Sequence, residues 1–287
     1  MHAGVVFPKT EIGDDPIVIR DYAQAIEDMG YTHLLAYDHV LGASTATRPD
    51  WSGPYTSETT FHEVFVLFGY LAAVTKQIEL VTGILILPQR QTVLVAKQAA
   101  EVDLLSGGRM RLGIGLGWND VEYEGLNENF HNRGSRSEEQ IAVLHALWTA
   151  PVIDFRGRWH TIDNAGIKPL PVQRPIPIWI GGYTEATLQR IGAMGDGWFP
   201  WRQPDDEMRA QIARLRSYAE AAGRDPNAIG LEPQLSVRSP EAQWQPYVDG
   251  WRDLGATHLC VNTMDAGFTS PDQHITALRR AKKILSF

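Results

Sequence analysis

The sequence has little that would tie it to a membrane, to an oxidising compartment or to nucleic acid. Its single cysteine, Cys260, cannot form an internal disulfide, and the segment from Met1 to Lys9 lacks the basic and apolar parts of a secretory signal. No apolar run approaches the length that spans a membrane. The net charge of -8 argues against a basic face for binding phosphate backbones. We therefore expect a cytoplasmic protein without a membrane or nucleic-acid partner.

The chain is long enough for one full α/β domain. It has 287 residues, of which 44% are hydrophobic, and we expect a single domain over residues 1–287. Short apolar runs alternate with segments of helical period along the whole chain. The predicted strands span residues 3–7, 32–36, 78–84, 110–116, 176–180, 198–199, 229–237 and 257–261. Eight strands alternating with helices predict the α/β class and a parallel (β/α)8 TIM barrel.

Two long connections interrupt the alternation of strands and helices. The first, Asp38 to Phe61, follows the second strand and is rich in Thr, Ser, Gly and Pro. The second, Thr149 to Pro175, follows the fourth strand and its helix, and Arg156-Gly157-Arg158 within it is typical of a small hairpin. Loops of this length either cover a functional site or elaborate the surface, and the sequence leaves both open for each insertion.

Three glycines alternate with bulky residues in the fourth predicted strand. At strand period Gly113, Gly115 and Gly117 share one face, which therefore carries no side chains. Such a face suits the close approach of a flat ring, although a tight barrel interior also requires small residues. The run lacks the last glycine of the dinucleotide fingerprint, since Trp118 or Asp120 stands in its place.

Polar residues follow the second predicted strand, at the end of the barrel where active sites lie. A histidine beside a carboxylate, as in Asp38-His39, can exchange a proton with a substrate oxygen; the alternative is a structural hydrogen bond. His62 and Glu63 do not form a zinc-binding H-E-x-x-H motif, because Val66 stands where the second histidine would be. The histidines show no metal-ligand spacing, so we expect no metal site.

A glycine pair follows the fifth predicted strand and leads directly into a helix. Gly181 and Gly182 free the backbone N–H groups, and the helix that follows Tyr183 and Thr184 presents its positive end. This arrangement predicts a phosphate cradle, and a plain tight turn is the alternative. After the glycine strip, Trp118 and Asn119 are expected over the same pocket; Asn119 offers a donor and acceptors to a ring edge, or caps its loop instead.

These residues together resemble the bacterial luciferase-like superfamily and, within it, the coenzyme F420-dependent oxidoreductases. The resemblance spans nearly the whole chain and depends on the order and spacing of several short motifs. The motifs are Asp38-His39, Thr82-Gly83-Ile84 with Leu87-Pro88, Ser106-Gly107-Gly108-Arg109 ahead of the glycine strip with Trp118-Asn119, Pro177 to Gly182, and Gly195-Asp196-Gly197-Trp198.

The resemblance implies a role for each of these segments. It implies a non-prolyl cis peptide at Gly83-Ile84 behind the central ring of the cofactor, and the cofactor phosphate at the loop that begins with Gly181. It places His39, assisted by Asp38, beside the reactive ring carbon as the proton partner of the hydride. We expect Gly117 against the ring with Gly115 just below it, and Gly113 in barrel packing. The family often forms homodimers, so a homodimer is expected here.

The function expected from the resemblance is hydride transfer between coenzyme F420 and a small organic substrate. The nearest alternative is an FMN-dependent monooxygenase of the same fold, in which the reduced flavin reacts with oxygen. A non-redox barrel enzyme is a further alternative, although a Schiff-base lyase needs a buried lysine near a strand end and only Lys9 is remotely placed. A cofactor-binding protein without turnover also stays open.

Overall fold

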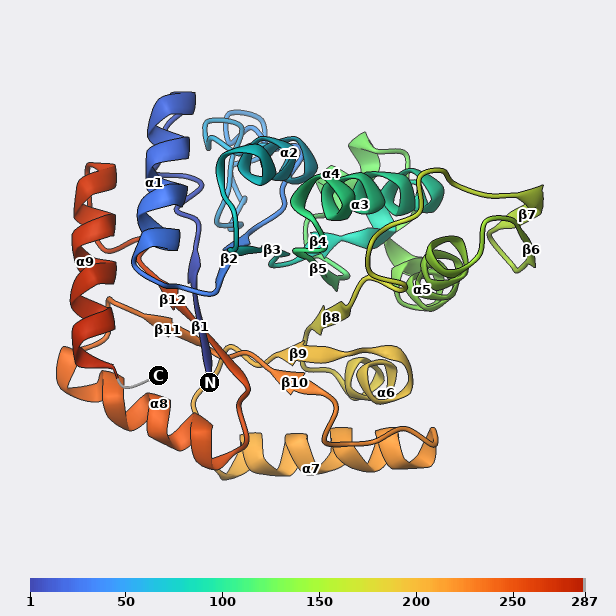
Figure 1. The fold of residues 1–287 in the computed structure, drawn as a ribbon. Helices are drawn as coiled ribbons and strands as arrows, with labels where there is room; N and C mark the ends of the chain where they lie inside the picture. Colours follow the sequence, from blue (N-terminus) through green and yellow to red (C-terminus); the bar gives the residue numbers. More distant parts are fainter. Residues whose placement is uncertain (286–287) are drawn as a thin grey trace.

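The computed structural model describes residues 1–285 and has a barrel of parallel strands with helices around its outside (Figure 1). In pairing order the strands of the main sheet are β10 (Gly230–Leu231), β9 (Gly197–Phe199), β8 (Ile178–Gly181), β5 (Met110–Gly115), β3 (Glu79–Thr82), β2 (His33–Ala36), β1 (His2–Val6), β12 (His258–Asn262) and β11 (Gln234–Ser236), with β4 (Leu85–Ile86) beside β5. All these pairs are parallel, so the carboxyl ends of the strands meet at one end of the barrel.

The expectation of one continuous strand over residues 229–237 is wrong. Glu232 and Pro233 separate β10, which pairs with β9, from β11, which pairs with β12. Proline has no N–H to donate to a ladder, which favours a break here. The backbone bonds from Glu232 N to Trp198 O and from Cys260 N to Pro233 O, both 3.0 Å, continue the pairing through the break. The strands β10 and β11 are therefore consecutive in the chain, and together they join β9 to β12 and close the barrel.

The longer helices begin and end largely where the local sequence signals place them. They are α1 (Pro16–Asp28), α2 (Val64–Val74), α3 (Thr92–Ser106), α5 (Arg133–Thr149), α6 (Glu185–Met194), α7 (Asp206–Ala221), α8 (Trp244–Asp253) and α9 (Pro271–Ile284). The side chain of Asp15 accepts a hydrogen bond from Ile17 N at the start of α1, and Gly107 ends α3 with φ of 73°. Within residues 1–285, every helix is too short or too polar to cross a membrane.

The two insertions lie at opposite ends of the barrel. Residues 37–63 follow β2 at the carboxyl ends of the strands. Residues 150–177 lead from α5 back to β8, which puts them at the amino ends, and they form the expected antiparallel hairpin of β6 (Ile153–Arg156) and β7 (Thr161–Ala165). Figure 1 shows this hairpin projecting beyond α5. The structure describes all residues of the second insertion, and none of them lines the cavity described below, so this insertion elaborates the surface.

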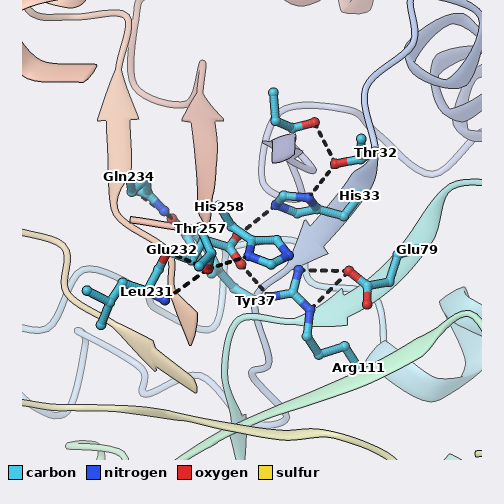
Figure 2. A network of polar contacts seen from close by, with 11 residues as sticks. Thr32, His33, Tyr37, Glu79, Arg111, Leu231, Glu232, Gln234, Thr257 and His258 are labelled. Atoms are coloured by element: carbon cyan, nitrogen blue, oxygen red, sulfur yellow. Dashed lines mark hydrogen bonds and ion pairs between the residues drawn. The ribbon is translucent and has the colours of Figure 1, made fainter. Parts of the chain in front are cut away.

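A network of charged side chains fills part of the barrel interior (Figure 2). The Arg111 guanidinium is 2% exposed and lies between two carboxylates, 2.5 Å from Glu232 Oε2 and 2.8 Å from Glu79 Oε2. The other Glu232 oxygen is 2.9 Å from His33 Nε2, and the ring of Trp179 lies 4.3 Å from the guanidinium carbon. Burial alone would raise the pKa of Glu232, but His33 and Arg111 hold it far below its ordinary value. This carboxylate therefore stays ionised inside the protein.

Histidines whose pKa is lowered by burial predict that acid weakens the fold before most carboxylates titrate. Burial lowers the pKa of His258 to about 3, with Arg111 contributing, and burial lowers that of His274 to about 4. Because the unfolded chain binds these protons from about pH 6.5 downward and the folded chain does not, the unfolding free energy should fall between pH 6.5 and pH 4. We expect a loss of about 2 kcal/mol, since partial wetting reduces the full effect.

Urea denaturation at pH 7.0, 5.5 and 4.5 measures this loss. The His274→Phe variant should have a shallower slope over the same range, because one of the histidines with a lowered pKa is then missing. Equal slopes for the two proteins would contradict the assignment to His274.

Candidate active site

A cavity of about 780 Å³ opens at the carboxyl ends of the strands. The strand ends and their following loops line most of it, and the first insertion lines the rest. The lining includes Tyr37, Asp38, Tyr55, Gly83, Ile84, Ile86, Gly117, Trp118, Arg133, Gly181, Gly182, Tyr183 and Thr184. Nine of the twelve site residues predicted from the sequence therefore reach one space, and His39, Gly115 and Asn119 do not line it. Its volume is typical of small-molecule and cofactor sites.

The bed of the cavity is a bulge between β3 and β4. The Gly83-Ile84 peptide is cis, as the family resemblance implies. A Cβ added at Gly83 would lie 2.1 Å from Leu35 Cδ2, so only glycine fits where this backbone passes β2. The side chain of Ile84 fits against two glycines, because a Cβ at Gly115 would lie 1.9 Å from Ile84 Cδ1 and one at Gly181 would lie 3.2 Å from Ile84 Cγ2.

The glycine strip therefore has three different roles. Gly113 is packed under the barrel wall, where an added Cβ would meet Thr82 O at 1.9 Å. Gly115 makes room for Ile84 and does not itself line the cavity, in contrast to the expected position just below a ring. Gly117 does line it, at a φ of 66° that favours glycine. The side chain of Ile84 therefore packs against the glycine face at Gly115, and the cavity lies beyond Ile84.

This arrangement predicts the outcome of a Gly115→Ala substitution. The new methyl group would overlap the terminal Cδ1 of Ile84, which borders the cavity and can turn, so we expect a cost at the lower end of the about 1–3 kcal/mol that overpacking causes. The Ile84→Ala change removes the overlapping atoms, so adding it to Gly115→Ala should cost less than the two single changes summed. Thermal unfolding of the four proteins measures this coupling, and strict additivity would show that Gly115 does not seat Ile84.

Trp118 and Asn119 follow the strip and have separate roles. Trp118 is 48% exposed at the rim, and its ring lies 5.8 Å from that of Trp51 in the first insertion. Gly53 is pressed between the two rings, since an added Cβ would lie 2.6 Å from each. Asn119 does not line the cavity: its side chain caps the short helix α4 (Asp120–Gly125) by accepting from Glu122 N at 3.4 Å. This is the capping alternative weighed for Asn119 in the sequence.

The loop of the predicted cradle forms part of the cavity lining. Gly181, Gly182, Tyr183 and Thr184 all line it, and α6 starts directly behind them with Thr184 as its N-cap. Gly182 has φ of 121°, and its carbonyl accepts a hydrogen bond of 2.8 Å from Trp198 Nε1, which fixes the loop. The positive end of α6 therefore faces the cavity together with a loop that exposes backbone N–H groups, and such a loop suits an anion.

Sequence reasoning missed Arg133, a cation in the lining of the same cavity. It is the first residue of α5 and lines the cavity, with its guanidinium stacked 3.6 Å from the centre of the Phe130 ring. One nitrogen donates to Phe130 O at 2.7 Å, whereas the buried Nε has no partner among residues 1–285. A phosphate at the cradle suits this orphaned donor. Nothing in its local sequence distinguished Arg133 from the neighbouring Arg136.

Asp38 lies at the cavity wall but does not assist His39. Its Oδ1 is 2.7 Å from Arg90 Nη2, and its Oδ2 accepts a 3.2 Å hydrogen bond from Ile86 N. Both oxygens are thus committed to the segment after the cis peptide. The expected pairing of Asp38 with His39 is therefore wrong, and Asp38 instead fixes the bed of the cavity from one side.

The carboxylate partner of His39 is Glu122, whose Oε1 lies 3.1 Å from His39 Nδ1. The His39 ring is buried under two aromatic rings of the first insertion, Tyr55 at 5.3 Å and Phe61 at 5.0 Å between centroids. His39 Nε2 is buried and finds no hydrogen-bond partner in the described part of the chain. The ring therefore lies one layer behind Tyr55, which lines the cavity.

One set of residues with metal-ligating side chains comes together within residues 1–285, deep in the barrel. His33, Glu232 and Cys260 offer ligand atoms within 4.8 Å of one another. Both Glu232 oxygens are already bonded, one to His33 and one to the Arg111 guanidinium. A permanent positive charge at this distance disfavours a second cation, so this set fits an ion-pair network better than a metal site.

Comparison with known proteins gives a family and a fold. The luciferase-like monooxygenase family matches residues 4–282 of the chain. An uncharacterized protein of Mycobacterium tuberculosis is 34% identical over 207 residues, covering 70% of this chain and 71% of that one. The FMNH(2)-dependent dimethylsulfone monooxygenase of Pseudomonas fluorescens is 31% identical over 227 residues, covering 78% of this chain and 58% of that one.

A solved structure agrees with the barrel over its whole length. The F420-dependent secondary alcohol dehydrogenase in complex with an F420-acetone adduct superposes with a TM-score of 0.79, covering 100% of this chain and 99% of that one. Their sequence identity is 16%, so the likeness concerns the fold.

Proposed function

The chain belongs to the luciferase-like monooxygenase family, and we propose that it is an oxidoreductase that uses a deazaflavin of the coenzyme F420 type to move hydride to or from a small organic substrate. The observation that carries the proposal is the arrangement of the cavity. Gly181, Gly182 and Thr184 line it together with Arg133, whose buried Nε has no partner within residues 1–285. His39, whose buried Nε2 also has no partner there, lies behind the cavity-lining Tyr55.

The residues present fit a ring cofactor that bears a phosphate. Gly181, Gly182 and Thr184 with Arg133 would hold the phosphate, and the bulge at Ile84 with Gly117 would support the ring. When bound, the deazaflavin supplies a ring carbon that accepts or donates hydride.

The protein must also transfer the proton that accompanies hydride transfer, at a site shielded from water. Hydride transfer to or from a carbon bearing oxygen is accompanied by movement of a proton at that oxygen, and His39 Nε2 is the nitrogen available for it. That nitrogen is buried, and the His39 ring lies against the rings of Tyr55 and Phe61. A substrate that reaches His39 must move one of these two rings aside, so we infer that the first insertion covers the site.

An FMN-dependent monooxygenase is the second candidate function. It is favoured by the 31% identity to an FMNH(2)-dependent monooxygenase, whose phosphate-bearing flavin the same cradle suits. Titration of the apoprotein with F420 and with FMN, followed by fluorescence, separates the two. We expect saturable F420 binding and substrate-dependent bleaching of the deazaflavin absorbance. Tight FMN binding with negligible F420 binding would replace the first proposal with the second.

A further inference from the structure

Glu122 is a carboxylate with an unusually complete set of donors. It lies on α4, is 2% exposed, and its Oε1 accepts hydrogen bonds from the backbone N–H groups of Val40 and Leu41. The same oxygen lies 3.1 Å from His39 Nδ1, and Oε2 accepts from Gln89 Nε2 at 3.0 Å. Burial alone would raise the pKa of Glu122, but the hydrogen bonds from His39 and from the Val40 and Leu41 amides hold it below its ordinary value.

An ionised carboxylate fixes which ring nitrogen of His39 carries hydrogen. Because Glu122 is then an acceptor only, His39 Nδ1 must donate to it, and Nε2 is left as the nitrogen with the lone pair when the ring is neutral. Asn119 caps α4 and the amides of Val40 and Leu41 tie it to the segment after β2, so Glu122 and His39 are held together by backbone as well as by side chains.

A second histidine shows what a purely structural pair looks like in the same protein. His160 also lies beside a carboxylate, with Nδ1 at 2.8 Å from Glu139, but its Nε2 is bonded at 2.6 Å to the Thr92 hydroxyl. Both of its nitrogens are satisfied, although the ring is only half-buried. His39 Nε2, in contrast, has no partner within residues 1–285 and lies directly behind the cavity-lining Tyr55.

We propose that Glu122 is a positioning residue that holds His39 in the Nδ1–H form, with Nε2 free for the proton that accompanies hydride transfer. This inference rests on the proposed function. In the direction of oxidation, the substrate C–H bond breaks with its electron pair, which leaves as hydride to the cofactor. The O–H proton passes to His39 Nε2 and the carbon–oxygen double bond forms. The Glu122 carboxylate offsets the positive charge that the imidazole gains, and the reverse direction returns the same proton.

The experiment compares Glu122→Gln with Glu124→Gln, an exposed carboxylate on the same helix that makes the same change in charge. Nitrogen-15 spectra of the imidazole rings, assigned with a His39→Gln variant, report the tautomer without any cofactor. We expect a single Nδ1–H form of His39 in the unsubstituted protein and in Glu124→Gln. In Glu122→Gln, whose amide accepts less strongly, a mixture of tautomers is expected.

Steady-state kinetics give the second measurement. Glu122→Gln should lower kcat about 10-fold to 100-fold with little change in KM, as for other residues that orient a catalytic histidine. Glu124→Gln should leave both unchanged, and Glu122→Gln should have no further effect once His39 is replaced. An Nε2–H form in the unsubstituted protein, or equal kcat for the two glutamine variants, would overturn the inference. Absence of turnover with F420 alongside the expected spectra would overturn the proposed function instead.

Discussion

Replacing Glu232 by Gln is expected to lower the free energy of unfolding by about 3–5 kcal/mol, because it leaves the Arg111 guanidinium buried without its closest anion. Arg111 Nη1 lies 2.5 Å from Glu232 Oε2, and both side chains are almost completely excluded from water. The amide keeps the shape of the carboxylate, so the loss measures charge and hydrogen bonding more than packing. Urea denaturation followed by circular dichroism gives the difference.

Glu79→Gln is the matched control for this prediction. Glu79 also bonds Arg111, at 2.8 Å, but is 33% exposed, so water screens the pair and its loss should cost about 1 kcal/mol or less. Equal destabilisation of the two glutamine variants would mean that water reaches the Arg111–Glu232 pair as well as the Arg111–Glu79 pair, which contradicts the burial of Glu232. The order of the two effects, more than either value, is therefore the diagnostic result.

The barrel was predictable from the sequence because most of its signals are local. The N-cap Asp15, the helix stop at Gly107 and the hairpin around Gly157 are each determined by a few neighbouring residues, and the structure has all three. The break at Glu232 and Pro233 was not predicted, since a strand that changes partners midway depends on two different neighbours in the sheet. Pro233 was the available signal in the sequence, because proline cannot donate to a strand ladder.

The sequence predicts the position of a site residue where the backbone alone determines it, and does not predict it where a partner distant in the sequence determines it. The glycine pair at Gly181 and Gly182 and the cis peptide at Gly83-Ile84 reach the cavity because topology brings the strand ends together. The partner of His39 could not be inferred: Asp38 adjoins it in sequence, yet the strand directs that carboxylate to Arg90 and leaves Glu122 to bind the ring. Spacing likewise could not show that Gly115 accommodates a side chain instead of a ligand.

Arg133→Met should weaken binding of a phosphate-bearing cofactor about 10-fold to 100-fold. A hydrogen bond to a charged group contributes about 1.5–3 kcal/mol, and each 1.4 kcal/mol is a factor of ten in affinity. The methionine keeps much of the packing against Phe130 while removing the Nε donor that has no partner within residues 1–285. Fluorescence titration of each protein with F420 and with FMN measures the change.

Ligands that lack the phosphate isolate the cause of this loss. If Arg133 acts on the phosphate, the variant should bind riboflavin, or the phosphate-free analogue of the deazaflavin, as well as the unsubstituted protein does. Arg156→Met removes an arginine that is 73% exposed on the β6–β7 hairpin, so it controls for net charge and should leave every affinity unchanged. An equal loss for ligands with and without phosphate would mean that Arg133 acts through the start of α5. The cradle at Gly181 and Gly182 would then have to hold the anion with backbone N–H groups and the α6 dipole alone.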